Sequence, residues 1–314
     1  MKNISDINSG KSITNNSLAY IIVTNTINRP VELVFRSLNA SLNQKIKPKK
    51  VILLDQNKAA LNLPDEIAKN PLFEKQNTSL NSVSAARNSL VIPDGTDWIF
   101  FCDDDGYPHP DYSEILQKKI SNDPDIEILA GNIIREDTNT NYTLRQKNFG
   151  SLKYFRNTKK LMGSNFVVKV KTFEELDRFD ENFGAGSYWG SGEETDFCWK
   201  AFFAKREMEF FPELIVYHVP PFHENMKTGF KKSFKYGVGK GALVWKWLFR
   251  KRKLIVIYEL LEMVIVPFIH FLRGIFTLKP SLIATHFASL IGRFYGLLKA
   301  SFANRKLFRM LNSL

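Results

Sequence analysis

Cysteine is scarce in this chain, whose 314 residues include only Cys102 and Cys198. Two cysteines in a chain of this length give no disulfide framework, which is typical of proteins that fold in a reducing compartment. Neither cysteine lies in a CxxC or cysteine–histidine spacing, so no zinc motif is present. Both lie in apolar surroundings, and we interpret them as small side chains of the core.

The sequence also lacks the glycine-rich phosphate loops of many nucleotide-binding proteins, since neither GxGxxG nor a Walker A motif occurs. Phosphates bound by this chain would then have to be neutralised by a metal ion and by side chains. Residues 1–17 are polar and contain no apolar run typical of a secretory signal, and we expect them to form a flexible lead-in.

Acidic residues are almost absent from residues 225–314. This part contains 17 lysines and arginines and two acids, Glu259 and Glu262, a balance of +15. Because the net charge of the whole chain is +12, residues 1–224 carry about −3. A charge-balanced domain, 18–224, is therefore followed by a strongly basic and apolar region. This asymmetry indicates that the two parts have different partners.

Short apolar runs alternate with helical patterns and predict an α/β fold. Residues 18–24 and 49–54 are typical of buried strands, and residues 31–42 between them have apolar side chains at helical spacing. Such a β–α–β unit opens many nucleotide-binding sheets. Similar patterns predict helices over 81–90, 111–120, 171–179 and 193–206, and strands over 126–130, 166–170 and 210–218.

The central motif is a triplet of aspartates, Asp103 to Asp105, directly after the apolar run Trp98 to Cys102. The run has the length and aromatic content of a buried strand, and open α/β sheets bind ligands at the carboxyl ends of their strands. Adjacent carboxylates repel one another unless a cation shares the site, and hard oxygen ligands suit Mg²⁺ or Mn²⁺. The alternative is a solvated acidic turn, but the strand before it favours a metal–phosphate site.

Polar residues from three further segments are expected at the same edge of the sheet. They are the loop Thr24 to Arg29, Asp55 after the second strand, and Arg87 with Asn88 on a helix. Asp55 can accept hydrogen bonds from a base or a ribose, although such an acid is also a common turn residue. Arg87 can pair with a base or a diphosphate, although a lone helical arginine is commonly a surface residue. Their joint arrangement indicates a nucleotide site.

A second acidic cluster, Glu193, Glu194 and Asp196, follows a Gly-rich aromatic loop at a helix start. It can supply a general base near the metal site, although acids in a first helical turn also complement the helix dipole. His218, at the end of an apolar strand, is a candidate third metal ligand or phosphate contact. A purely structural role and the nearby His223 are the alternatives.

Several segments, in this order, resemble the family-2 glycosyltransferases of the GT-A fold. The matching segments are IIVTNTINRP, VILLDQN, SAARN, WIFFCDDDGYPHP, GSGEETDFCWKA and IVYH. They cover roughly residues 18–224, and YGVGKGAL in the tail is similar to part of bacterial capsule and O-antigen enzymes. The resemblance implies a mixed sheet flanked by helices. It also implies an inverting transferase that uses a nucleotide-diphosphate sugar and a divalent ion.

By position, the resemblance implies that the nucleotide-sugar-binding residues are Thr24, Asp55, Arg87, Asp103 and Asp104. Asp104 would lie near the ribose, and Asp103 would be the first acid of a DxD pattern whose last acid, Asp105, binds the metal. The family's usual base is the aspartate of a Glu-Asp pair. Glu194 occupies that place with a longer side chain, and Asp196 is the competitor.

The aromatic residues Tyr188 and Trp189 of the Gly-rich loop are candidates for an apolar platform under the acceptor sugar. Packing in the core would explain them equally well. Specificity for one donor sugar or one acceptor depends on the shape of the pocket, which this sequence does not encode in a readable motif.

The tail contains a nearly continuous apolar segment, Leu254 to Leu272. Its 19 residues approach the roughly 20 that cross a bilayer, but Glu259, Glu262 and Pro267 interrupt it. We therefore expect helices that lie on an anionic membrane surface, with the basic cluster 250–253 on the headgroups. Alternatives are a membrane span, a helical subdomain or the interface of a homodimer.

These features predict a metal-dependent glycosyltransferase, peripheral or monotopic at the cytoplasmic face of the bacterial inner membrane, that takes part in surface polysaccharide synthesis. Its donor would be a UDP- or dTDP-type sugar, and its acceptor a saccharide or a lipid-linked saccharide. A catalytically silent sugar-nucleotide or membrane-surface binding protein of the same fold is the main rival. Nucleic-acid binding is disfavoured by the long apolar stretches of the tail, and a nucleotidyltransferase by the missing phosphate loop.

Overall fold

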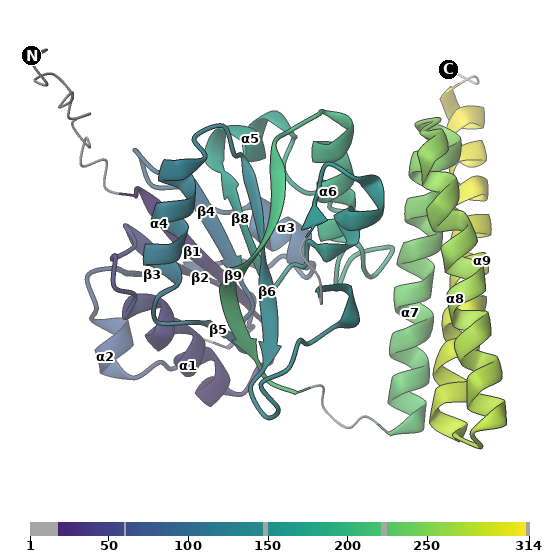
Figure 1. Cartoon of the computed structure of the whole chain (residues 1–314), viewed down its shortest axis with the longest axis horizontal. Helices are drawn as coiled ribbons and strands as arrows, with labels where there is room; N and C mark the ends of the chain where they lie inside the picture. The colour runs from purple at the N-terminus through teal and green to yellow at the C-terminus, as the bar shows by residue number, and fades with distance from the viewer. Residues whose placement is uncertain (1–17, 60, 147–149, 221–224, 312–314) are drawn as a thin grey trace, which may run out of the picture.

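The computed structural model describes residues 18–59, 61–146, 150–220 and 225–311, so the expected lead-in 1–17 lies outside the described residues. Its centre is a nine-stranded mixed sheet with helices on both faces (Figure 1). The strands are β1 (Tyr20–Thr26), β2 (Lys50–Asp55), β3 (Phe73–Asn77), β4 (Trp98–Cys102), β5 (Gly106–Pro108), β6 (Ile128–Arg135), β7 (Gly150–Ser151), β8 (Asn165–Lys169) and β9 (Met208–His218). Their order is β3-β2-β1-β4-β8-β6-β9-β5, and β7 pairs with β9.

The strand pairing brings the carboxyl ends of β1, β2 and β4 to one edge of the sheet. These strands are parallel, and Thr26 of β1 lies opposite Asp55 of β2. The short strand β5 follows the aspartate triplet and runs antiparallel to β9, with Gly106 opposite His218. This register carries a histidine from the far end of the domain to the residues just after β4. The fold therefore gathers the predicted site at one place.

Side chains alternate along the buried strands and divide the core into two layers. Tyr20 and Ile22 of β1 face the layer formed with α1 and α4, whereas Ile21 and Val23 face the layer formed with α5 and α6. The helices of this part are α1 (Val31–Leu42), α2 (Asp65–Ala68), α3 (Val83–Asn88), α4 (Tyr112–Asn122), α5 (Val170–Glu175) and α6 (Glu193–Phe203), with 3₁₀ turns over Leu144–Gln146 and Phe155–Lys160.

A helical extension stands beside α6 at one end of the molecule (Figure 1, green to yellow). It consists of α7 (Met226–Val244), a π-helical segment (Trp245–Arg250), a 3₁₀ turn (Leu254–Val256), α8 (Ile257–Phe276) and α9 (Pro280–Leu311). Glycines let α7 and α9 touch through their backbones. A Cβ at Gly241 would overlap the carbonyl oxygen of Arg293, and a Cβ at Gly296 would overlap that of Val238.

Within the described residues, one helical segment, 254–276, is long and apolar enough to cross a membrane. Its two acids nevertheless face the protein. Glu259 is 4% exposed and pairs with Lys240 of α7, and Glu262 lies 2.9 Å from Lys159 of the sheet domain. The helix also exposes a run of large apolar side chains, namely Ile257, Leu261, Ile265, Val266, Phe268, Ile269 and Ile275. It is therefore amphipathic, with its acids paired to the rest of the protein.

Most of the elements predicted from apolar patterns are present, with shifted ends. The helix predicted over 171–179 ends early, at Glu175, because Asp177 and Arg178 adopt positive φ angles of 55° and 42°, which break a right-handed helix. Strands β3, β5 and β7 were not predicted. β3 contains polar, half-buried residues at the edge of the sheet, and β5 and β7 are too short to show a period.

Candidate active site

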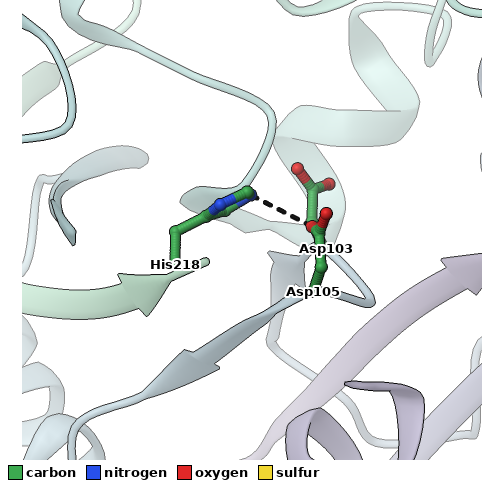
Figure 2. Close-up of side chains that lie close together, drawn as sticks. All are labelled: Asp103, Asp105 and His218. Carbon is green, nitrogen blue, oxygen red and sulfur yellow. Dashed lines mark ion pairs between the residues drawn. The ribbon is translucent and has the colours of Figure 1, made fainter. Parts of the chain in front are cut away.

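Asp103, Asp105 and His218 lie together beyond the carboxyl end of β4 (Figure 2). One ligand atom from each residue lies within 4.8 Å of the other two. His218 Nε2 is 3.0 Å from Asp105 Oδ1, while its Nδ1 donates a hydrogen bond to the Val219 carbonyl oxygen at 2.9 Å. The Nδ1 bond orients the ring so that Nε2 faces the aspartates. Two carboxylates and one imidazole nitrogen form a donor set that suits Mn²⁺ or Mg²⁺.

The charges of this cluster depend on one another. Burial acts to lower the pKa of His218, but the hydrogen bond and charge of Asp105 outweigh it and raise that pKa to about 9. Burial acts to raise the pKa of Asp105, yet His218 and Arg29 hold it below its usual range. His218 is therefore a cation at neutral pH when no metal is bound. A divalent ion would replace the proton on Nε2, as metals do at histidine ligands.

Asp104 points towards β1 rather than towards the other two aspartates. It accepts hydrogen bonds from the Thr26 hydroxyl at 2.7 Å and from Arg29 Nε at 2.9 Å. A second nitrogen of Arg29 lies 3.0 Å from Asp105 Oδ2, so one guanidinium bridges two carboxylates. Burial nevertheless raises the pKa of Asp104 to about 6. Asp104 is thus bound to the protein's own cation and contributes less to a metal site than its two neighbours.

Arg87 is buried, with 2% of its surface exposed, and does not lie at the surface as a lone helical arginine commonly does. Its Nη2 is 3.2 Å from Asp103 Oδ1, and its Nε donates to Asn25 Oδ1 at 3.2 Å. Its Nη1 is buried without a hydrogen-bond partner among the described residues. Buried donors are nearly always paired, so this nitrogen indicates a missing acceptor next to Asp103.

Glu194, in the first turn of α6, reaches the same region. A Cβ built on Gly163 would lie 3.9 Å from the Glu194 carboxyl carbon and 3.3 Å from Arg87 Nη1. Burial raises the pKa of Glu194 well above its usual range and the charge of Glu193 adds to the effect, whereas Arg87 acts against it. A partly buried carboxylate with increased basicity near the metal cluster has the properties of a general base.

Asp196, the competing candidate base, belongs to a different environment. It is fully buried, and its Oδ1 accepts hydrogen bonds from Lys246 Nζ and Trp247 Nε1, both at 2.7 Å. Both donors belong to the π-helical segment of the extension. A carboxylate enclosed in this way is better placed to hold the extension than to reach an acceptor hydroxyl, and its role as a catalytic base stays a prediction that this environment disfavours.

The two remaining nucleotide candidates lie on the expected strands. Asp55 ends β2 and is 2% exposed, and its Oδ1 accepts hydrogen bonds from the backbone and side chain of Asn57. Thr24 is fully buried in β1, and its hydroxyl has no partner among the described residues. Their contact with a nucleoside stays a prediction. His223 lies outside the described residues.

Tyr188 and Trp189 lie towards the extension. Both line a pocket of about 250 Å³ between the Gly-rich loop and helices α7 and α9. The ammonium of Lys299 on α9 lies 4.0 Å from the ring centre of Tyr188 and 5.4 Å from that of Trp189. Tyr188 is 60% exposed, so it is not a core residue. Their role under an acceptor sugar stays a prediction.

Sequence reasoning missed the partners that organise these side chains. Arg29 was considered only as the end of a loop, although the motif NRP after β1 places a cation beside the aspartates. Asn25 was not singled out as a partner of Arg87. Lys246 and Trp247 carry no signal that could link them to α6, because they lie about fifty residues further along the chain.

The mixed sheet, with its acidic motif after the fourth strand and its flanking helices, has the GT-A architecture of glycosyltransferases. The family described as "Glycosyl transferase family 2" matches residues 21–179, just over half of the chain. The chain belongs to this family. The predicted fold, with its C-terminal helical extension, is thereby confirmed.

Solved structures of the same fold include TarS from S. aureus. Residues 1–349 of TarS match with 14% identity and a TM-score of 0.53, over 74% of this chain and 66% of that one. A complex of this TarS piece with UDP-GlcNAc matches with a TM-score of 0.52, and this chain covers 67% of it. A longer TarS structure is covered to 40%. At this identity the likeness establishes the fold alone. No curated protein matches the chain.

Proposed function

We propose that this protein is an inverting glycosyltransferase that moves a sugar from a UDP- or dTDP-type donor to a saccharide or lipid-linked acceptor during bacterial surface polysaccharide synthesis. In this proposal residues 18–224 form the catalytic domain and residues 225–314 associate with the membrane. The observation that carries it is the convergence of Asp103, Asp105 and His218 beside the buried Arg87, whose Nη1 has no hydrogen-bond partner among the described residues. TarS, which has the same fold, has been solved with UDP-GlcNAc, and this supports a UDP-type donor.

The residues of the acidic cluster fit a divalent ion. Asp103, Asp105 and His218 would hold Mg²⁺ or Mn²⁺, which, when bound, offsets the charge that grows on the leaving diphosphate. The unpartnered Nη1 of Arg87 would donate to an oxygen of the same diphosphate, since arginine and phosphate pair strongly. Without the donor, Arg87 keeps Asp103 in place through their contact at 3.2 Å.

The nucleoside would lie along the carboxyl ends of β1 and β2. Thr24 and Asp55 belong to these neighbouring strands, and Asp104 would reach the ribose from β4. Arg29 and Thr26 fix the Asp104 carboxylate, which is 5% exposed, so its direction is set before the donor binds. Such preorganisation reduces the entropy that is lost on binding.

Glu194 would act as the general base. It would remove the proton of the acceptor hydroxyl while that oxygen attacks the anomeric carbon from the side opposite the diphosphate. The bond from the anomeric carbon to the diphosphate oxygen breaks as the new glycosidic bond forms, so the configuration at that carbon inverts. Burial raises the pKa of Glu194, so its carboxylate, once ionised, takes up the acceptor proton more readily than an exposed carboxylate would.

A membrane location would suit the extension. In α8, Glu259 and Glu262 pair with lysines of the protein while many apolar side chains are exposed, as in helices that lie in a membrane interface. The basic residues 250–253 directly precede this helix and would contact anionic headgroups. An acceptor attached to a lipid would then be presented beside Tyr188 and Trp189.

The experiment is a screen of UDP- and dTDP-sugars for thermal stabilisation of the protein, each with Mn²⁺, with Mg²⁺ and with EDTA. One donor class should raise the melting temperature only when the metal is present, and the same donor should be hydrolysed or transferred. D105A should keep the fold and lose this response. Metal-dependent binding without any turnover would point to a silent binding protein. Stabilisation that is equal in EDTA would refute the metal role.

A further inference from the structure

We infer that Lys246 and Trp247 of the C-terminal extension are positioning residues for the catalytic helix α6, and that they act on Glu194 through Asp196. The inference rests on the proposed role of Glu194 as the base. It gives the extension a second task besides membrane association, because part of it fixes the start of the helix that carries the catalytic carboxylate.

Asp196 is held by groups from outside its own domain. Its Oδ1 lies 2.7 Å from both Lys246 Nζ and Trp247 Nε1, and the same lysine is 2.8 Å from Asp180. Asp196 is fully buried, and its second oxygen has no hydrogen-bond partner among the described residues. A buried carboxylate in this state depends on the cation that is paired with it, here Lys246.

The loop that leads into α6 is also held by the extension. Ser191 Oγ donates to the Tyr236 carbonyl oxygen of α7 at 3.3 Å, and a Cβ at Gly239 would overlap Ser191. Gly192 caps the helix with a φ angle of 95°, and any larger side chain there would meet Leu243. The loop and the first turn of α6 thus follow the surface of α7.

The geometry of the helix connects these contacts to the chemistry. Glu194 and Asp196 are two residues apart, so their side chains point about 200° away from each other around the helix. Glu194 faces Gly163 and Arg87, and Asp196 faces the extension. The first turn is therefore held between the donor site and the extension. If Lys246 is removed, Asp196 must move towards water or take up a proton, and either change displaces Glu194.

The test compares K246M with K246R, W247F and the control K118M, a substitution of an exposed lysine on α4, away from the extension and from the basic cluster 250–253. K246M should lower kcat at least tenfold and leave the donor KM within twofold, whereas K246R should recover most of the activity. W247F should give an intermediate loss, and K118M none. In the double variant D196N/K246M, which removes both charges, kcat should be higher than in K246M.

Amide hydrogen exchange supplies a readout that does not need activity. Exchange in residues 190–198 should become faster in K246M and stay unchanged in K118M, while the strands keep their protection. Exchange in residues 190–198 that is the same in K246M as in the wild type would overturn the positioning role. So would a decrease in kcat that is fully explained by a smaller fraction of folded K246M. Absence of glycosyl transfer by the wild type would refute the proposed function, and the exchange measurement would still decide whether the extension positions α6.

Discussion

Replacing His218 by glutamine should remove most of the dependence of stability on pH between 6.5 and 9. The pKa of His218 rises from its ordinary value of 6.5 to about 9 in the folded protein, because Asp105 Oδ1 lies 3.0 Å away and outweighs the effect of burial. At about 1.4 kcal/mol for each factor of ten in proton affinity, the pair contributes about 3 kcal/mol to the free energy of unfolding.

The sign follows from the direction of this pKa change. The folded state binds the proton more tightly than the unfolded state, so the contribution is complete below pH 6.5 and is lost as the pH rises to 9. Asp104, with a pKa raised to about 6, titrates mainly below this interval. Denaturant unfolding of wild type and H218Q, in EDTA at pH 6.5 and 9, measures the effect. If wild type and H218Q lose the same free energy of unfolding between pH 6.5 and pH 9, the assignment of this proton to His218 is refuted.

The other predictions concern the base, the helix packing and the membrane. E194Q should lower kcat by about 10²- to 10⁴-fold with the donor KM nearly unchanged, because a base acts only in the chemical step. A similarly large increase in the donor KM would instead indicate a role in binding. G296A should destabilise the protein by about 1 to 3 kcal/mol because its methyl group meets the Val238 backbone, whereas G229A, with room beside Thr285, should not. If G296A melts at the same temperature as the wild type, this packing of α7 against α9 is contradicted. R250Q/K251Q should weaken binding to anionic vesicles about thirtyfold, at about 1 kcal/mol per charge, whereas the control K118Q/K171Q should not. If R250Q/K251Q cosediments with the vesicles as well as the wild type does, these residues do not contact the headgroups.

The buried strands were predictable because they are short continuous apolar runs, and the first helix was predictable because its apolar residues recur at helical spacing. Helix α1 spans Val31–Leu42 as predicted, and β4 spans Trp98–Cys102. Helix α7 was not predicted as such, because glycines such as Gly237 and Gly241 disfavour an isolated helix. In the structure these glycines face α9, and close packing between the two helices compensates for their low helix propensity.

The candidate site was predictable where it depends on the ends of strands. Asp103 and Asp105 follow β4 directly, and His218 ends β9, so the pattern of apolar runs placed them at one edge of the sheet. The pairing of Asp196 could not be predicted because its partner, Lys246, lies fifty residues away in sequence. Such a pairing depends on how the extension docks, and no local pattern encodes it.

Binding of Mn²⁺, measured by electron paramagnetic resonance with a UDP-sugar present and absent, tests the central claim most directly. The wild type should bind one ion per chain, more tightly when the donor is present, and the proton released from His218 should appear in the buffer. D103N/D105N, which keeps the shape of both side chains, should bind no ion at the same concentrations. Equal Mn²⁺ binding by this variant would contradict the proposal that these aspartates hold the metal that grips the donor.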